Sequence, residues 1–302
     1  MVKFTHQLSC WAILLVLLLC QVLDAADLGD EPKTPAGELQ IRLDWPLAKK
    51  SESGQAARLT WLFSTHITFN EPVKDISRAQ LGGLAQNAYL EMETDIKQYG
   101  VKYKPGKKIL AMPGVITLLA FDNEIILSSS MRGPNLITGF EDTSLWARLN
   151  MCDELYKQYI DENDVRGHKN ERSCGEIMAL HQYLKRYPER DMQELAARDP
   201  KVIMTTVTQP NKQPIKIIKP CGTDEVSETH YLKFYDDTNY FFKEGAHGCD
   251  LLVGGFRDND GNEIEGPIAD YIPQDSPIDT DFELEDLAGG VKDIDQIGSL
   301  CD

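Results

Sequence analysis

The chain carries a clear helical pattern in its first third. Apolar side chains recur every three or four positions between Ser77 and Tyr99, at Leu81, Leu84, Ala85, Ala88, Met92 and Ile96. Residues with this spacing share one face of a helix, and Gly100 is well suited to end it. The pattern predicts a helix over residues 77–99 with one buried face.

Two short apolar runs follow and predict a β-hairpin. Residues 115–121 and 124–129 are rich in aliphatic and β-branched side chains, and only Asp122-Asn123 separates them. Strands joined by a two-residue connection pair in an antiparallel manner. We therefore expect a local antiparallel pair whose second strand ends in small polar residues.

A second helix is predicted near Cys174, with reactive groups in its first turn. Apolar residues recur at helical spacing at Ile177, Ala179, Leu180, Tyr183 and Leu184. Ser173 is suited to be the N-cap, and Glu176 three residues later completes a capping-box pattern. A helix N-terminus lowers the pKa of a thiol and favours negative charge, so Cys174 and Glu176 are candidates for chemistry.

Two further strands are predicted after this helix. Residues 202–207 form a run rich in β-branched side chains, and residues 215–218 follow a turn that contains proline and polar residues. The second of these strands leads directly into Pro220-Cys221. A second cysteine is thereby delivered to the end of a strand.

The order of these elements resembles that of the cytidine-deaminase-like zinc hydrolases, in which a helix and a hairpin precede a Cys-x-Glu helix and a strand ending in Pro-Cys. The resemblance covers about residues 77–255. It implies an α/β fold with three α/β/α layers around a mixed central sheet. It also implies that Cys174 and Cys221 bind zinc, and that Glu176 moves protons without binding the metal. Ser128, Ser129 and Ser130 would line the substrate pocket.

The third zinc ligand departs from the pattern of that family. A further cysteine is expected three residues after Cys221, where this chain has Asp224. Cys249, which follows an inserted segment and opens a helix-like stretch, is the favoured replacement. Asp224 is the alternative, because a carboxylate also binds zinc, and a degenerate site without metal is the third interpretation.

The histidines are given no role in this interpretation. His168 precedes the Cys-x-Glu helix in a charged stretch, and we expect it to be a solvated loop residue. His66 is expected to be at the surface or half-buried, and His181 to be a core or surface residue. His247 ranks below Cys249 as a zinc ligand.

The N-terminus predicts export of the protein. Lys3, the apolar run 11–19 and the small residues Ala25 and Ala26 are typical of a signal peptide, here residues 1–26, that is removed on secretion. The apolar run is too short for a membrane span. We therefore expect a secreted protein with no membrane association after signal removal.

The remaining chain is divided by composition into three parts. Residues 27–72 are polar and are interpreted as an N-terminal extension, and residues 73–268 as the deaminase-like domain, with an insertion over 131–172. Residues 269–302 are strongly acidic and contain two prolines, which predicts a mobile, extended tail.

Charge and cysteine content limit the classes of partner and of cross-link. The 302-residue chain has a formal net charge of −17. This charge argues against nonspecific binding to double-stranded nucleic acid, but it does not exclude a nucleoside or base as a substrate. Removal of the signal would leave an odd number of cysteines: Cys152, Cys174, Cys221, Cys249 and Cys301. Three ligands with a Cys152–Cys301 disulfide account for them, and so do two disulfides with one free thiol.

Two hypotheses of different classes follow. The first is a zinc-dependent hydrolytic deaminase whose partner is a small-molecule substrate, namely a nucleoside, a nucleobase or a related small amidine. The second is a non-catalytic secreted interaction protein on a degenerate deaminase-like scaffold. In that case Cys174, Cys221 and Cys249 would serve disulfides or packing, and Glu176 would only cap its helix.

Overall fold

The computed structural model describes most of the chain and omits several segments. The described residues are 26–51, 59–101, 111–157, 168, 170–210, 213–221, 231–233, 239–241, 248–254, 256–257 and 263–302. The expected signal peptide, except for its last residue, lies outside this part of the chain, as do Asp224 and His247. None of the described helices is long and apolar enough to cross a membrane.

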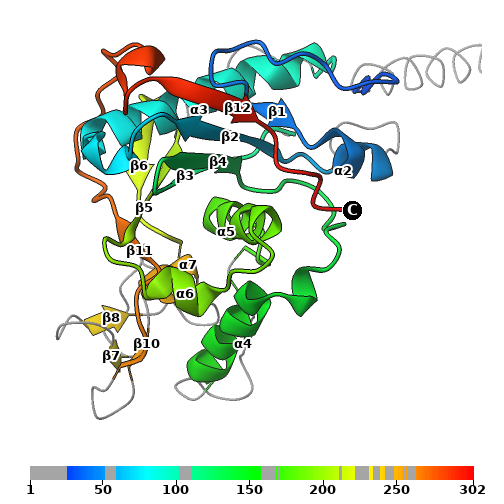
Figure 1. Cartoon of the computed structure of the whole chain (residues 1–302). Coiled ribbons are helices and arrows are strands. Elements are labelled where there is room, and N and C mark those ends of the chain that lie inside the picture. Colours follow the sequence, from blue (N-terminus) through cyan, green and yellow to red (C-terminus); the bar gives the residue numbers. More distant parts are fainter. Residues whose placement is uncertain are drawn as a thin grey trace, which may run out of the picture.

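The centre of the molecule is an eight-stranded sheet, so the fold is α/β. Its strands are β1 (Arg42–Leu43), β2 (Phe63–Phe69), β3 (Val115–Phe121), β4 (Glu124–Ser129), β5 (Val202–Thr208), β6 (Lys216–Ile218), β11 (Ala269–Tyr271) and β12 (Val291–Asp295). They are ordered β1-β2-β4-β3-β5-β11, with β12 paired to β2 and β6 paired to β5 (Figure 1). All pairs are antiparallel except β5 with β11. The predicted hairpin is confirmed as β3 and β4.

Helices and small ribbons surround this sheet. The helices are α2 (Trp45–Lys50), α3 (Arg78–Gln98), α4 (Ser144–Lys157), α5 (Gly175–Arg186), α6 (Met192–Ala196) and α7 (Cys249–Gly254), with short 3-10 turns η3 (Val73–Asp75), η4 (Phe140–Asp142) and η5 (Leu284–Asp286). Two small ribbons pair β7 (Tyr231–Lys233) with β8 (Asn239–Phe241), and β9 (Phe256–Arg257) with β10 (Glu263–Glu265). The expected insertion therefore contains a regular helix, α4.

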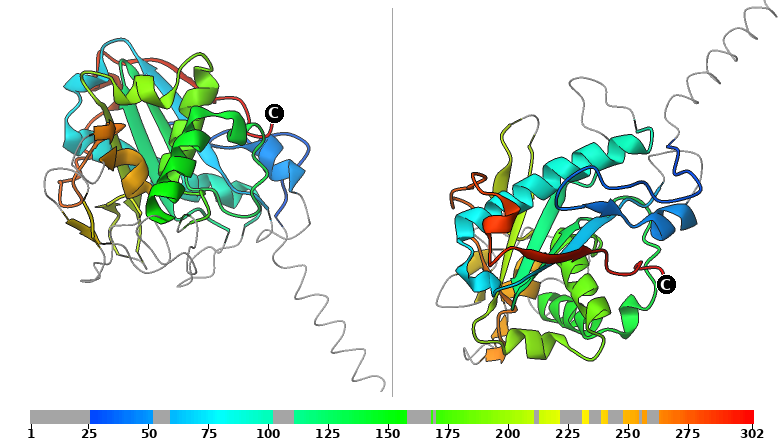
Figure 2. Two further views of the ribbon diagram at one scale, coloured as in Figure 1. Left: turned by 90° about the horizontal axis from the view of Figure 1, so that it is seen from below. Right: turned by 45° about the horizontal axis from the view of Figure 1, so that its top comes forward.

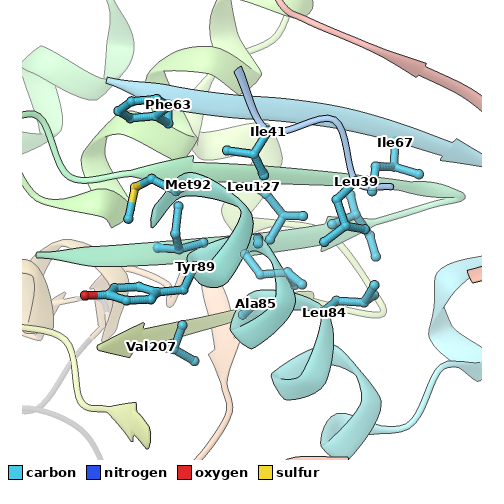
Figure 3. Close-up of a cluster of buried hydrophobic side chains, with 14 of the residues drawn as sticks. Leu39, Ile41, Phe63, Ile67, Leu84, Ala85, Tyr89, Met92, Leu127 and Val207 are labelled. Carbon is cyan, nitrogen blue, oxygen red and sulfur yellow. The ribbon is translucent and has the colours of Figure 1, made fainter. Parts of the chain in front are cut away.

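Helix α3 covers one face of the sheet, as its apolar spacing predicts. Ser77 is its N-cap, and a reciprocal capping box joins Ser77 to Gln80. Side chains on its buried face, among them Leu84 and Met92, pack toward the strands (Figure 3). Gly83 has no room for a Cβ, which would overlap the carbonyl oxygen of Asp279.

The opposite face of the sheet is covered by α5. Side-chain alternation along β3 divides the core: Ile116 and Leu118 belong to the cluster that contains α3, whereas Leu119 and Phe121 belong to the cluster that contains α5. Helices α4, α6 and α7 lie beyond α5 on the same side (Figure 1). Helices therefore flank both faces of the sheet.

The expectation of a mobile acidic tail is wrong. Strand β11 extends the sheet beside β5, and β12 runs antiparallel along β2 (Figure 2). Apolar residues scattered among the acids, such as Ile272, Ile297 and Leu300, are buried. Burial of these apolar side chains stabilises the segment against the rest of the protein, although its composition is strongly acidic.

His66 contacts β12 and β4, and its side chain is more buried than expected. Its Nδ1 lies 2.8 Å from Asp295 Oδ1 of β12, and its Nε2 lies 2.5 Å from Glu124 Oε2 of β4. The Tyr187 hydroxyl also donates to Glu124. Segments from both ends of the chain thus complete the sheet on which α5 rests.

Candidate metal centre

The N-terminus of α5 lies closely against the sheet. The helix begins at Gly175 with Cys174 as its N-cap, and the Cys174 side chain makes no capping hydrogen bond. A Cβ at Gly175 would overlap the Thr117 hydroxyl of β3, so only glycine permits this approach. The prediction of Ser173 as N-cap is wrong, because the cysteine takes that place and Glu176 turns to the sheet.

Three cysteines meet at this helix end. Cys174 Sγ lies 3.1 Å from Cys221 Sγ, and the Cys249 backbone N–H donates to Cys221 Sγ at 3.2 Å. Cys221 follows β6, and Cys249 is the first residue of α7. The structure thus brings together the three cysteines that the sequence nominates, and the described cysteines, Cys152 and Cys301 included, are all free thiols.

A histidine joins the cluster, contrary to expectation. His168 is only 6% exposed, and its Nε2 lies 3.4 Å from Cys249 Sγ and 3.9 Å from Cys221 Sγ. Its Nδ1 accepts the backbone N–H groups of Asn170 and Arg172 at 3.3 and 3.4 Å. The prediction of a solvated loop residue is therefore wrong, because the buried ring lies between the sulfurs and the backbone N–H groups of residues 170 and 172.

The cluster has the composition and size of a zinc site. The ligand atoms of His168, Cys174, Cys221 and Cys249 all lie within 4.8 Å of one another. Three thiolates and an imidazole are a typical zinc donor set, and zinc–sulfur bonds in a tetrahedron place sulfurs about 3.8 Å apart. These residues therefore fit a zinc ion with small adjustments of their side chains.

The pKa values of the three thiols are shifted by burial and by the hydrogen bonds between them. Hydrogen bonds with Cys174 and then Cys249 lower the pKa of Cys221 well below its usual value. The same bond to Cys221 raises the pKa of Cys174, and burial raises that of Cys249. Metal binding to the three thiols would release their protons.

Glu176 is held beside the cluster by two hydroxyl groups. Thr206 Oγ1 of β5 and Tyr271 OH of β11 donate to Glu176 Oε1 at 3.1 and 3.2 Å. Glu176 is only 3% exposed. Burial, followed by the negative charge of Cys221, raises the pKa of Glu176 to about 7. Tyr271 was not nominated by the sequence, because it lies in the segment expected to be a mobile tail.

Glu176 and two of the cysteines face a shared cavity. The cavity has a volume of about 640 Å³, and its lining includes Cys174, Glu176, Thr206 and Cys221. A volume of this size suits a small organic ligand. The arrangement combines a metal donor set, a buried proton-transfer group and space for a substrate.

The serines expected in the pocket are placed differently. Ser128 and Ser129 are fully buried, and their hydroxyls donate to the backbone oxygens of Ser129 and Ser130. Ser129 also accepts the N–H of Phe63, which ties β4 to β2. Of the three serines, Ser130 is the one in the cavity lining.

His181 is a core residue on α5. Its ring stacks on Phe140 with centroids 4.7 Å apart, and its burial lowers its pKa to about 4. The low pKa is a consequence of this burial, and the ring contact with Phe140 is typical of a core residue.

Comparison of the chain with protein-family models, with curated proteins and with solved structures found no match. The donor set, Glu176 and the cavity are therefore the features from which a function can be inferred.

Proposed function

We propose that the centre binds zinc and that the protein is a hydrolytic deaminase acting on a nucleoside, a nucleobase or a related small amidine. One observation carries the proposal: Glu176 and the ligands Cys174 and Cys221 line the same cavity. The Cys-x-Glu helix start and the strand before Pro-Cys support a deaminase-like arrangement of the core. Deaminases combine a metal site with a carboxylate that does not bind the metal.

The residues of the chain divide the chemistry between them. When bound, zinc lowers the pKa of a water molecule to about 7 and supplies a nucleophile at neutral pH. Cys174, Cys221 and Cys249 would hold the metal. Glu176 takes a proton from the attacking water and passes it to the nitrogen that leaves as ammonia. An amidine and water are thereby converted to a carbonyl compound and ammonia.

The surroundings of Glu176 suit this proton transfer. A pKa of about 7 leaves both protonation states populated near neutral pH, so the group can accept and release a proton. Thr206 and Tyr271 both donate to Oε1 and fix the carboxyl group in one orientation. A fixed carboxyl group need not be reoriented during the reaction.

A second candidate is a closed, structural zinc site in a non-catalytic protein. The observation that favours it is His168 Nε2, 3.4 Å from Cys249 Sγ, which offers a fourth protein ligand. Structural zinc sites use four protein ligands, whereas catalytic sites keep one position for water or substrate. The role of His168 therefore decides between the two functions.

The hydrogen bonds of His168 favour the catalytic alternative. Because Nδ1 accepts two backbone N–H groups, a neutral ring carries its proton on Nε2. That N–H would donate to the sulfurs and would have no lone pair for the metal. Three thiolates would then bind zinc, with the fourth position open.

Export is part of the same proposal. Its support is the charged, apolar and small-residue order of residues 1–26, which is typical of a signal peptide. Mass spectrometry of the protein from the culture medium should give a mature N-terminus near Ala25 or Ala26. A chain that stays in the cells would contradict export without affecting the metal site.

The first experiment measures zinc in protein purified without chelator. We expect about one zinc ion per chain, lost in Cys249→Ala and retained in Cys301→Ala, which removes a described thiol outside the cluster. His168→Gln should retain zinc if three thiolates suffice. Loss of zinc in His168→Gln would instead support the closed structural site.

The second experiment measures ammonia released from a panel of nucleosides, nucleotides and bases. Glu176→Gln should retain zinc and lose at least about a hundredfold in turnover, as expected for a general acid–base. A substrate that Glu176→Gln converts at the wild-type rate would refute the mechanism. Glu194→Gln, the same substitution at an exposed residue of α6 outside the cavity lining, is the matched control.

A further inference from the structure

The cavity beside the metal centre differs in charge from the rest of the protein. The chain as a whole has a formal net charge of −17. Two cationic side chains, Arg132 and Lys219, nevertheless line the cavity, against the exposed carboxylate of Glu171 and the buried Glu176. Arg132 and Lys219 are thus local positive charges in the lining of an otherwise acidic molecule, and exposed positive charges attract anionic ligands.

Both cationic residues are set by rigid parts of the backbone. Arg132 exchanges two backbone hydrogen bonds with Trp61, at 2.7 and 2.9 Å. The next residue, Gly133, has a φ of +107°, and a Cβ there would overlap the carbonyl oxygen of Leu59. Lys219 lies directly between β6 and Pro220-Cys221. The two side chains therefore start from fixed positions at the cavity.

Other parts of the cavity lining are apolar. Met112, Val115, Met131 and Ile218 contribute to the lining from three separate segments of the chain. Methionine and aliphatic side chains provide surfaces against which a flat heterocycle can pack. The lining thus combines an apolar surface, cationic side chains that remain exposed, and the reactive group Glu176.

We infer that the substrate carries a phosphate group, and that it is a nucleoside monophosphate in preference to a nucleoside or a free base. The inference rests on the proposed function, because it assigns the substrate class of the same site. Arg132 would bind phosphate oxygens through its planar fork, and Lys219 would contribute a second positive charge. The heterocycle would occupy the apolar part of the cavity near Glu176.

The test is a binding measurement that does not require turnover. Zinc-loaded Glu176→Gln protein is titrated with cytidine monophosphate and with cytidine, by calorimetry at physiological salt. Because two ionic contacts are at stake, the monophosphate should bind about tenfold or more tightly than the nucleoside. Adenosine and its monophosphate form a second pair, so that the result does not depend on one base.

Substitutions then assign the preference to residues. Arg132→Gln and Lys219→Gln should each reduce the preference for the monophosphate severalfold, with zinc content unchanged. Lys216→Gln is the matched control, because Lys216 is exposed on β6 three residues before Lys219 and does not line the cavity. Inorganic phosphate should compete with the monophosphate in the wild-type background.

Each outcome bears on the inference separately from the proposed function. Equal binding of nucleosides and monophosphates, or an equal effect of Lys216→Gln and Lys219→Gln, would overturn the assignment. Tighter binding of a single-stranded tetranucleotide than of the mononucleotide would also overturn it, since a phosphodiester would then be the group recognised. A phosphate preference without ammonia release in the wild type would uphold the substrate class and reject the deaminase. Ammonia release from nucleosides, without tighter binding of monophosphates, would uphold the deaminase and reject the inferred substrate class.

Discussion

Two buried carboxyl groups show how surroundings separate a functional acid from a structural one. Glu176 and Asp95 both have a pKa raised to about 7, and burial is the main cause in each case. Glu176 faces a cavity and is held by Thr206 and Tyr271. Asp95 lies on α3, where Gln98 donates to Oδ1 at 2.9 Å, and Oδ2 accepts no hydrogen bond from the described residues. A raised pKa alone would not distinguish them, but the cavity and the adjacent thiols do.

Asp95 makes stability depend on pH. Its pKa is 3.8 when unperturbed and about 7 in the folded protein, so the folded state binds the proton more tightly. The stability associated with this proton is complete below about pH 4 and is lost as the pH rises through 7. Asp95→Asn removes the ionisation and should stabilise the protein at pH 8 by on the order of 2 to 4 kcal/mol, with little gain at pH 4.5.

Urea unfolding of wild type and Asp95→Asn between pH 4.5 and 8 measures this effect. Asp75→Asn, which changes an exposed carboxylate in η3, serves as the control. Its unfolding free energy should differ little from that of the wild type at every pH. A constant offset between Asp95→Asn and wild type at every pH would contradict the assignment.

At the scale of elements, α4 supports the helix that carries the third cysteine. Arg148 of α4 is only 3% exposed. Its Nε donates to the carbonyl oxygen of Leu252 in α7 at 3.2 Å, and its Nη2 donates to that of Gly266 at 2.8 Å. These bonds connect α4 to two points of the chain after Cys249, one within α7 and one at Gly266. Helix α4 of the expected insertion therefore supports the candidate metal centre.

Arg148→Met should weaken both folding and metal binding. It leaves two carbonyl groups without these donors, which costs on the order of 2 to 4 kcal/mol of unfolding free energy. Because α7 begins at Cys249, zinc affinity should fall as well, measurable by competition with a chromogenic chelator. Arg198→Met, which breaks a partly exposed pair with Asp122, should cost less than about 1 kcal/mol and leave zinc affinity unchanged. Similar losses in both variants would argue against a specific role for α4.

The sequence predicts local elements well and long-range pairings poorly, and the reason is physical. The periodicity of α3 and the β3–β4 hairpin depend on neighbouring residues and are predicted correctly. Cys174, Cys221 and Cys249 were nominated by local patterns and meet in space. His168 has no periodic context, and its burial depends on how its loop folds against distant sulfurs. Tyr271 and β12 were missed because their acidic surroundings suggested a mobile tail.

At the scale of the whole molecule, the two ends of the chain complete the sheet. Strand β2 lies between β4 on one side and both β1 and β12 on the other. It is fully internal, although it belongs to the segment interpreted as an N-terminal extension. Strand β11 adds Tyr271, which donates to Glu176, from the expected tail. The core over residues 73–268 therefore depends on strands outside those bounds, as the right-hand view of Figure 2 shows for β12 beside β2.

The fragment 73–268 should consequently fail to fold as an independent unit. It lacks β2, so β4 would expose its backbone hydrogen-bonding groups at a new edge, and the apolar residues of β4 would lose Phe63 and Ile67 as neighbours. Glu124 would lose its contact with His66, and Glu176 its contact with Tyr271. Size-exclusion chromatography and hydrogen exchange should show aggregation or weak protection for this fragment, against a protected monomer for residues 26–302. A chain that ends at residue 290 loses β12 and the buried residues Ile297 and Leu300, but none of the four cluster residues, and should keep zinc with a lower melting temperature. A 73–268 fragment that is protected and binds zinc like the longer chain would show that the end strands are additions to an autonomous domain.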